Sequence, residues 1–130
     1  MKTTYNYIIH GVPAITPKNR ASCFSAFEKQ RILNIRYKRD LEEQHANRPL
    51  LTGYLIFLAK FYFPPQHPIE PRENKPHHQK PDCLRLLEFI DRIALGILYD
   101  NHSTIIKFEG EKLYSLKPRT EIILIEERKK

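Results

Sequence analysis

Residues 82–102 contain five side chains that could take part in chemistry as metal ligands or general bases: Asp82, Glu88, Asp91, Asp100 and His102. Glu88 and Asp91 are three residues apart, a spacing that puts both side chains on one face of a helix. Carboxylate oxygens are the ligands that Mg²⁺ prefers, while an imidazole favours Mn²⁺ or another softer metal. If the five side chains converge, they form a metal site, and His102 is chemically able to act as a general base.

A structural role for the same residues is the competing interpretation. Asp82 directly precedes an apolar helical pattern and is suited to a helix N-cap. Glu88 has basic neighbours on the same helix surface, with which it can form ion pairs. Asp100 and Asn101 are typical turn residues. The residue types and spacings leave both interpretations open.

Hydrophobic periodicity predicts the elements that position these residues. The expected strands are 5–10, 52–63, 103–110 and 121–127, and the expected helices are 24–46 and a segment that starts after Asp82 and ends near Gly96. The strand 52–63 is the most apolar stretch, so we expect it to be largely buried. A chain of 130 residues fits one domain. The order predicts a single α+β domain, residues 1–130, with one mixed β-sheet packed against two main helices.

Six of the ten prolines lie within residues 64–81. This composition predicts an extended, mobile loop inside the domain, because proline cannot donate a backbone hydrogen bond. His67, His77 and His78 lie in the same segment, without a cysteine or acidic partner at a tight spacing. A solvated loop is therefore favoured there over a metal cluster.

The chain is basic, with a net charge of +7 from 22 Lys and Arg against 15 Asp and Glu. Such a charge attracts polyanions, which makes nucleic acid the first partner to consider and an anionic membrane the second. A basic surface without a functional role is the third interpretation. No apolar run is long enough for a membrane span or a signal peptide, and the two cysteines, Cys23 and Cys83, suit a reducing compartment. We therefore expect a cytoplasmic protein that does not insert into a membrane.

Five stretches in order along the chain resemble one known family: GVPAITPKNR, GYLIFLAKFYFPP, HHQKPD, GILYDNHSTI and EKLYSLKPRTEIILI. They are similar to the RusA-like crossover-junction endodeoxyribonucleases, which resolve Holliday junctions in DNA recombination and repair. The resemblance covers roughly residues 5–126. It implies a RusA-like fold, branched DNA as the partner, Mg²⁺ as the cofactor and a homodimer.

The family site begins with Pro-Asp-x-Asp-Asn-Leu and has a lysine three residues after the Asn. Asp82 occupies the first aspartate position, whereas Leu84 occupies the second and Arg85 replaces the Asn. Glu88 stands at the lysine position. A leucine cannot coordinate Mg²⁺, so the resemblance predicts a family member whose metal site is degenerate.

Paired aspartates in a later turn complete the family site. Asn101 and His102 align with this pair, one residue after Asp100. By resemblance, Asp82 and Asp100 are the residues that would still hold the metal. A shift of one residue in the turn would bring Asp100 into the site.

Binding of DNA does not require the metal ligands, because cations and backbone amides make most phosphate contacts. By the resemblance to the family's basic loop, Lys18 and Arg20 are expected to contact phosphates. Lys80 precedes the site, and Lys112 and Arg119 flank the last two strands, so these three are further candidates.

Three functions follow from these observations. The leading one is a RusA-like protein that binds branched or duplex DNA and has an impaired Mg²⁺-dependent endonuclease site. The second is an active metal-dependent endodeoxyribonuclease with rearranged ligands. The third is a protein-interaction module that reuses the fold, since function does not follow from fold.

Overall fold

The computed structural model describes residues 2–13, 23–65, 73–78 and 81–128, with backbone alone for 23–29. Its main elements are β1 (Lys2–His10), α1 (Cys23–His45), β2 (Tyr54–Phe63), α2 (Cys83–Ala94), β3 (Ile105–Tyr114) and β4 (Arg119–Glu127). A short 3₁₀ helix, His102–Thr104, precedes β3. All six elements predicted from hydrophobic periodicity are confirmed, although β1, β3 and β4 are longer than predicted, and β2 and β3 each begin two residues later than predicted.

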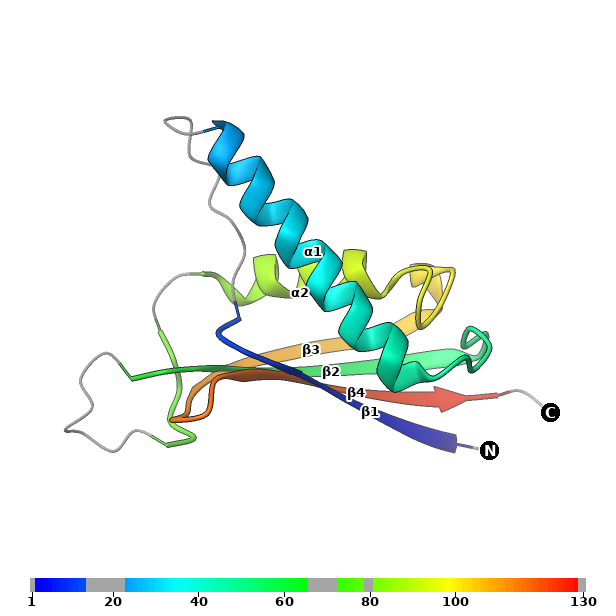
Figure 1. Cartoon of the computed structure of the whole chain (residues 1–130). Coiled ribbons are helices and arrows are strands. Elements are labelled where there is room, and N and C mark those ends of the chain that lie inside the picture. The colour runs from blue at the N-terminus through cyan, green and yellow to red at the C-terminus, as the bar shows by residue number, and fades with distance from the viewer. Residues whose placement is uncertain (1, 14–22, 66–72, 79–80, 129–130) are drawn as a thin grey trace.

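The four strands form one mixed sheet in the order β1-β4-β2-β3. β4 is antiparallel to both of its neighbours, β1 and β2, whereas β2 and β3 are parallel. A parallel pair needs a crossover connection, and α2 lies within that connection. Both helices lie on the same side of the sheet (Figure 1). The predicted single α+β domain with a mixed sheet and two main helices is confirmed.

The amphipathic pattern of α2 fixes its position over the sheet. Its buried residues recur at helical spacing: Leu86, Phe89, Ile90, Ile93 and Ala94. Gly96 follows the C-cap residue with φ of +90°, a left-handed conformation that glycine adopts without strain. Gly96 therefore ends the helix, as the sequence predicts, and the chain turns towards the segment that carries His102.

The buried face of α1 is narrower, and its fully buried residues are four positions apart: Tyr37, Leu41 and His45. His45 Nδ1 lies 2.8 Å from the hydroxyl of Tyr7, and its Nε2 lies 3.1 Å from the carbonyl oxygen of Pro49. A neutral imidazole with its proton on Nε2 satisfies both contacts. Burial raises the pKa of Tyr7 to about 12, so its hydroxyl stays protonated as the donor to Nδ1.

The second face of the sheet carries no helix among the described residues (Figure 1). Ile56 is paired with Ile125, and Leu58 with Ile123, so these four branched side chains form an apolar centre on that face. All four are partly exposed. The expectation that residues 52–63 are largely buried holds for the face of β2 towards the helices and for Tyr62 on the second face, whereas Tyr54 and Lys60 on that second face are exposed. An apolar run does not reveal which face of a strand another element covers.

Residues 73–78, the described part of the proline-rich segment, are attached to the outer edge of β3. Asn74 N donates to Tyr114 O at 2.8 Å, Tyr114 N to Lys75 O at 2.9 Å and His77 N to Lys112 O at 2.9 Å. The His77 ring stacks on Phe63 with a centroid distance of 4.1 Å. These bonds give this part a fixed position, which differs from the mobile loop that its composition predicts.

No described helix is both long and apolar enough to span a membrane.

Candidate functional site

Asp91 and His102 are brought together at the C-terminal end of α2. The His102 Nδ1 atom lies 3.3 Å from Asp91 Oδ2, and the Tyr99 hydroxyl donates a 2.7 Å hydrogen bond to Asp91 Oδ1. The His102 side chain is 60% exposed, whereas that of Asp91 is 22% exposed. Burial, together with the hydrogen bond to the Asp91 carboxylate, raises the pKa of Tyr99. The result is an exposed imidazole oriented by a carboxylate that a buried phenol holds in place.

The other three candidate residues do not join this pair. Asp82 is the N-cap residue of α2, as predicted, but its side chain makes no capping hydrogen bond, and only its carbonyl oxygen accepts from Leu86 N, at 3.1 Å. Glu88 and Asp100 have exposed side chains. Asn101 makes the turn before the 3₁₀ helix, because its side chain accepts a hydrogen bond from Ser103 N.

The length of α2 separates Asp82 from the Asp91–His102 pair. Asp82 precedes the first turn and Asp91 lies near the last, which corresponds to about 13 Å along the axis at a rise of ~1.5 Å per residue. No group of three or more His, Cys, Asp or Glu side chains within the described residues is arranged to hold a metal ion. The described residues therefore do not fit one Mg²⁺ site that includes both Asp82 and the later turn. Mg²⁺ or Mn²⁺ binding stays a prediction of the resemblance.

The first turn of α2 is where the resemblance predicts metal ligands. Leu84 is 67% exposed and Arg85 is also exposed, so both point to solvent where the family has a carboxylate and an amide. Cys83 is partly buried and its pKa is raised, mainly by burial. A partly buried thiol and a leucine offer no oxygen ligand for a hard cation. Within the described segment 81–86, Asp82 is the only carboxylate.

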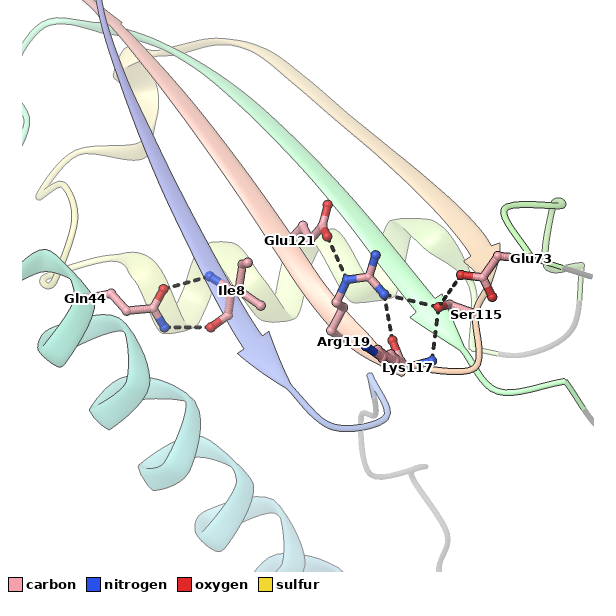
Figure 2. Close-up of polar contacts among 7 residues, drawn as sticks. All are labelled: Ile8, Gln44, Glu73, Ser115, Lys117, Arg119 and Glu121. Carbon is pink, nitrogen blue, oxygen red and sulfur yellow. Dashed lines mark hydrogen bonds and ion pairs between the residues drawn. The ribbon is translucent and has the colours of Figure 1, made fainter.

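Lys112 and Arg119, two of the predicted phosphate-binding residues, are engaged within the chain. Lys112 Nζ donates a 2.8 Å hydrogen bond to the Pro81 carbonyl oxygen, beside Asp82. Arg119 donates to Glu121, Ser115 and the Lys117 carbonyl oxygen, as Figure 2 shows. Its guanidinium also lies 3.9 Å from the centre of the Tyr62 ring. Arg119 thus fixes the turn between β3 and β4. Lys18, Arg20 and Lys80 lie outside the described residues.

Three exposed cations lie on one face of α1, where the exposed carboxylate of Glu42, four residues after Lys38, accompanies them. Arg31, Lys38 and Arg39 are exposed, and they lie on one helix face because Lys38 and Arg39 follow Arg31 by seven and eight residues. Ile32 and Ile35 lie between them and are 59% and 45% exposed. We call these five residues the α1 ridge. The helical spacing of these cations is visible in the sequence, but such a run is also typical of a solvated helix surface, which was the favoured interpretation.

The α1 ridge and the two ends of α2 are thus three separate places with functional groups. No family model matches the chain, and no curated protein matches it significantly. Chemically, the ridge is suited to bind an anionic polymer, and His102 presents an exposed imidazole beside Asp91. The end of α2 at Asp82 offers a carboxylate with Lys112 nearby.

Proposed function

We propose that the chain is a RusA-like protein that binds branched DNA, such as a Holliday junction, or duplex DNA, and that its Mg²⁺-dependent endonuclease site is impaired. The α1 ridge is the observation that carries the binding part of this proposal. Three exposed cations on one face of a helix are able to contact a phosphate backbone together, and the overall charge of +7 adds long-range attraction.

The impaired chemistry is supported by the positions of the remaining acidic groups. Metal-assisted phosphodiester hydrolysis needs oxygen ligands that converge on one ion. Asp82 lies at one end of α2 and the Asp91–His102 pair at the other, while Leu84 replaces the carboxylate between them in the family pattern. We infer binding without efficient cleavage. The homodimer and the cytoplasmic location that the resemblance and the cysteine usage imply are part of the same proposal.

A protein-interaction module is the second candidate, and the uncovered face of the sheet favours it. Its apolar centre, formed by Ile56, Leu58, Ile123 and Ile125, has the character of an interface core. Charged residues of both signs surround this centre, among them Lys60, which is paired with Glu121. A face of mixed charge attracts a polyanion less strongly than the α1 ridge does, so the phosphate backbone of DNA and a protein partner would use different surfaces.

Salt-dependent binding distinguishes these two functions. We would measure fluorescence anisotropy of a labelled four-way junction and a matched linear duplex while raising KCl from about 50 to about 200 mM, a range in which phosphate-dominated binding weakens steeply. The test variant carries Arg31→Gln, Lys38→Gln and Arg39→Gln. The control variant carries Lys60→Gln, Lys75→Gln and Lys107→Gln, which removes the same charge from other exposed positions.

The proposal predicts that the ridge variant binds both DNAs more weakly. The slope of log affinity against log salt should fall by about 0.9 for each phosphate that the variant no longer neutralises. The control variant should retain most of the wild-type affinity. Equal decreases in the two variants would show that net charge, and not the α1 ridge, produces the binding. Absence of salt-sensitive binding by the wild type would favour the protein-interaction module.

A further inference from the structure

A cleft of about 340 Å³ opens at the end of the sheet where β2 and β3 begin and β4 ends. Its lining combines an aromatic ring, a guanidinium, a carboxylate and two hydroxyls, and consists of Thr52, Gly53, Tyr54, Thr104, Glu127 and Arg128. Its volume lies near the lower end of the range for small-molecule sites. The cleft is distant from the α1 ridge in sequence and shares no residue with it.

Tyr54 and Glu127 are directly opposite each other in the β2–β4 register, so their side chains lie on the same face of the sheet. The Tyr54 side chain is 43% exposed, which leaves part of its ring accessible to a flat ligand. Glu127 is also exposed. An aromatic surface and a hydrogen-bond acceptor are thus placed side by side, as recognition of a nucleobase requires.

Glu126 fixes the arginine and the backbone of this cleft. This carboxylate is 1% exposed, and its Oε2 accepts hydrogen bonds from the backbone N–H groups of Thr52 and Gly53, both at 3.0 Å. Its Oε1 accepts a 3.1 Å hydrogen bond from Arg128 Nε. The Nε contact orients the guanidinium and leaves its terminal N–H groups as donors, in a side chain that is 59% exposed.

Gly53 allows the start of β2 to approach the end of β4 closely beside the cleft. A Cβ atom at this position would lie 2.6 Å from the Glu127 carbonyl oxygen and 3.0 Å from Glu126 Cγ. A side chain here would therefore push against the backbone of β4 and against the carboxylate that holds Arg128. The absence of a side chain lets the backbone N–H of Gly53 reach Glu126.

We propose that this cleft binds a single nucleotide with its base unpaired. The base stacks on Tyr54, Arg128 reaches the phosphate around the end of β4, which stops at Glu127, and the hydroxyls of Thr52 and Thr104 bind the sugar or phosphate oxygens. Glu127 accepts a hydrogen bond from the exocyclic amino group of cytosine or adenine, which thymine lacks. This site goes beyond the proposed phosphate contacts of the α1 ridge, because it recognises one base and not a run of phosphates.

Isothermal titration calorimetry with deoxycytidine monophosphate tests the proposal. Deoxythymidine monophosphate, deoxycytidine and inorganic phosphate serve as partial ligands. The test variants are Arg128→Gln, Tyr54→Leu and Glu127→Gln. Arg85→Gln and Glu109→Gln, at exposed positions outside the cleft, are the matched controls, and circular dichroism verifies the fold of every variant.

We expect saturable binding of deoxycytidine monophosphate that is about tenfold or more weakened by Tyr54→Leu, as base–aromatic stacking predicts. Arg128→Gln should bind the nucleotide and the nucleoside about equally. Glu127→Gln should reduce the preference for cytosine over thymine, since the amide also offers a donor. The controls should bind as the wild type does. No saturable binding, or equal effects of test and control variants, would overturn the proposal.

The nucleotide has two sources, a free monophosphate or an unpaired position in a DNA strand, and competition separates them. If an oligodeoxycytidylate displaces the bound monophosphate at a lower concentration than free monophosphate does, the cleft binds a DNA strand. If the oligonucleotide competes less well than the free monophosphate, the cleft binds free nucleotide. The α1 ridge variant should bind the monophosphate as the wild type does. Loss of junction binding with retained nucleotide binding would therefore separate the two sites.

Discussion

The hydroxyl of Tyr99 donates a 2.7 Å hydrogen bond to Asp91, and this bond joins the last turns of α2 to the segment that leads into β3. The same carboxylate faces His102 through its second oxygen. Asp91 therefore holds the segment that, by the resemblance to the RusA-like family, corresponds to the paired aspartates. In this chain the carboxylate of Asp91 organises that segment. Asp91 lies about 13 Å from Asp82 along the axis of α2.

Replacement of Tyr99 by Phe removes the hydroxyl and leaves the ring in the core. We expect the free energy of unfolding to fall by about 1 kcal/mol, the usual contribution of one hydrogen bond. Urea denaturation followed by circular dichroism measures the change. Tyr54→Phe, at a 43% exposed position, is the control and should change stability much less. Equal stability of Tyr99→Phe and the wild type would show that the hydrogen bond to Asp91 adds nothing.

Glu126 is a buried carboxylate with three hydrogen-bond donors, two from backbone N–H groups and one from Arg128. Glu126→Ala leaves two backbone donors unsatisfied near the start of β2. We expect it to lower the free energy of unfolding by roughly 2–4 kcal/mol. Glu127→Ala, at the exposed neighbouring position, should cost less than about 0.5 kcal/mol. Thermal or urea denaturation that ranks the two variants in the opposite order would contradict this assignment.

Gln44 bridges α1 to the edge strand β1. Its Oε1 accepts a 2.7 Å hydrogen bond from Ile8 N, and its Nε2 donates a 2.6 Å hydrogen bond to Ile8 O, as Figure 2 shows. Gln44→Ala should lower the free energy of unfolding by about 1 kcal/mol, because water replaces part of both bonds. Hydrogen exchange should accelerate at the Ile8 amide. Glu43→Ala, one residue earlier on α1, should leave that exchange rate unchanged.

His77 should make stability depend on pH. Burial, reinforced by the charge of Lys112, lowers the pKa of His77 from 6.5 to about 4 in the folded chain. Between these values the unfolded state binds more protons than the folded state. The free energy of unfolding contributed by His77 is therefore complete above pH 6.5 and is lost as the pH falls from 6.5 towards 4.

Urea denaturation at about pH 7.5 and about pH 5, on either side of the unfolded-state pKa, tests this dependence. His77→Phe keeps an aromatic ring against Phe63 and removes the titrating group, so this variant should lose less stability between the two pH values than the wild type does. His10→Phe, at an exposed position on β1, the opposite edge strand of the sheet, is the control and should lose as much as the wild type. An unchanged pH dependence in His77→Phe would refute the role of this imidazole.

Sequence periodicity was sufficient for the order and type of the main elements. The apolar spacing in α2 is strong, and Asp82 and Gly96 mark its ends, so its position along the chain followed directly. Periodicity could not show that residues 73–78 pair with β3. That pairing depends on backbone hydrogen bonds to Lys112 and Tyr114, which are distant in sequence.

The candidate site was less accessible to sequence reasoning. Spacing placed Glu88 and Asp91 on one helix but could not show that Tyr99 and His102 occupy both oxygens of Asp91. Arg119 was expected to face DNA, yet its hydrogen bonds within the β3–β4 turn depend on how that turn closes. A side chain's charge predicts which ligands it prefers, but its partners are set by packing between distant segments.

The most direct test of the proposed function is a native gel with a labelled four-way junction and a matched linear duplex, each run with Mg²⁺ and with Mn²⁺. Wild type and Asp82→Asn are compared, and the products are then resolved on a denaturing gel. We expect a salt-sensitive shift of the junction by both proteins and no metal-dependent cleavage by either. Metal-dependent cleavage by the wild type that disappears in Asp82→Asn would contradict the proposed function and establish an active nuclease with rearranged ligands.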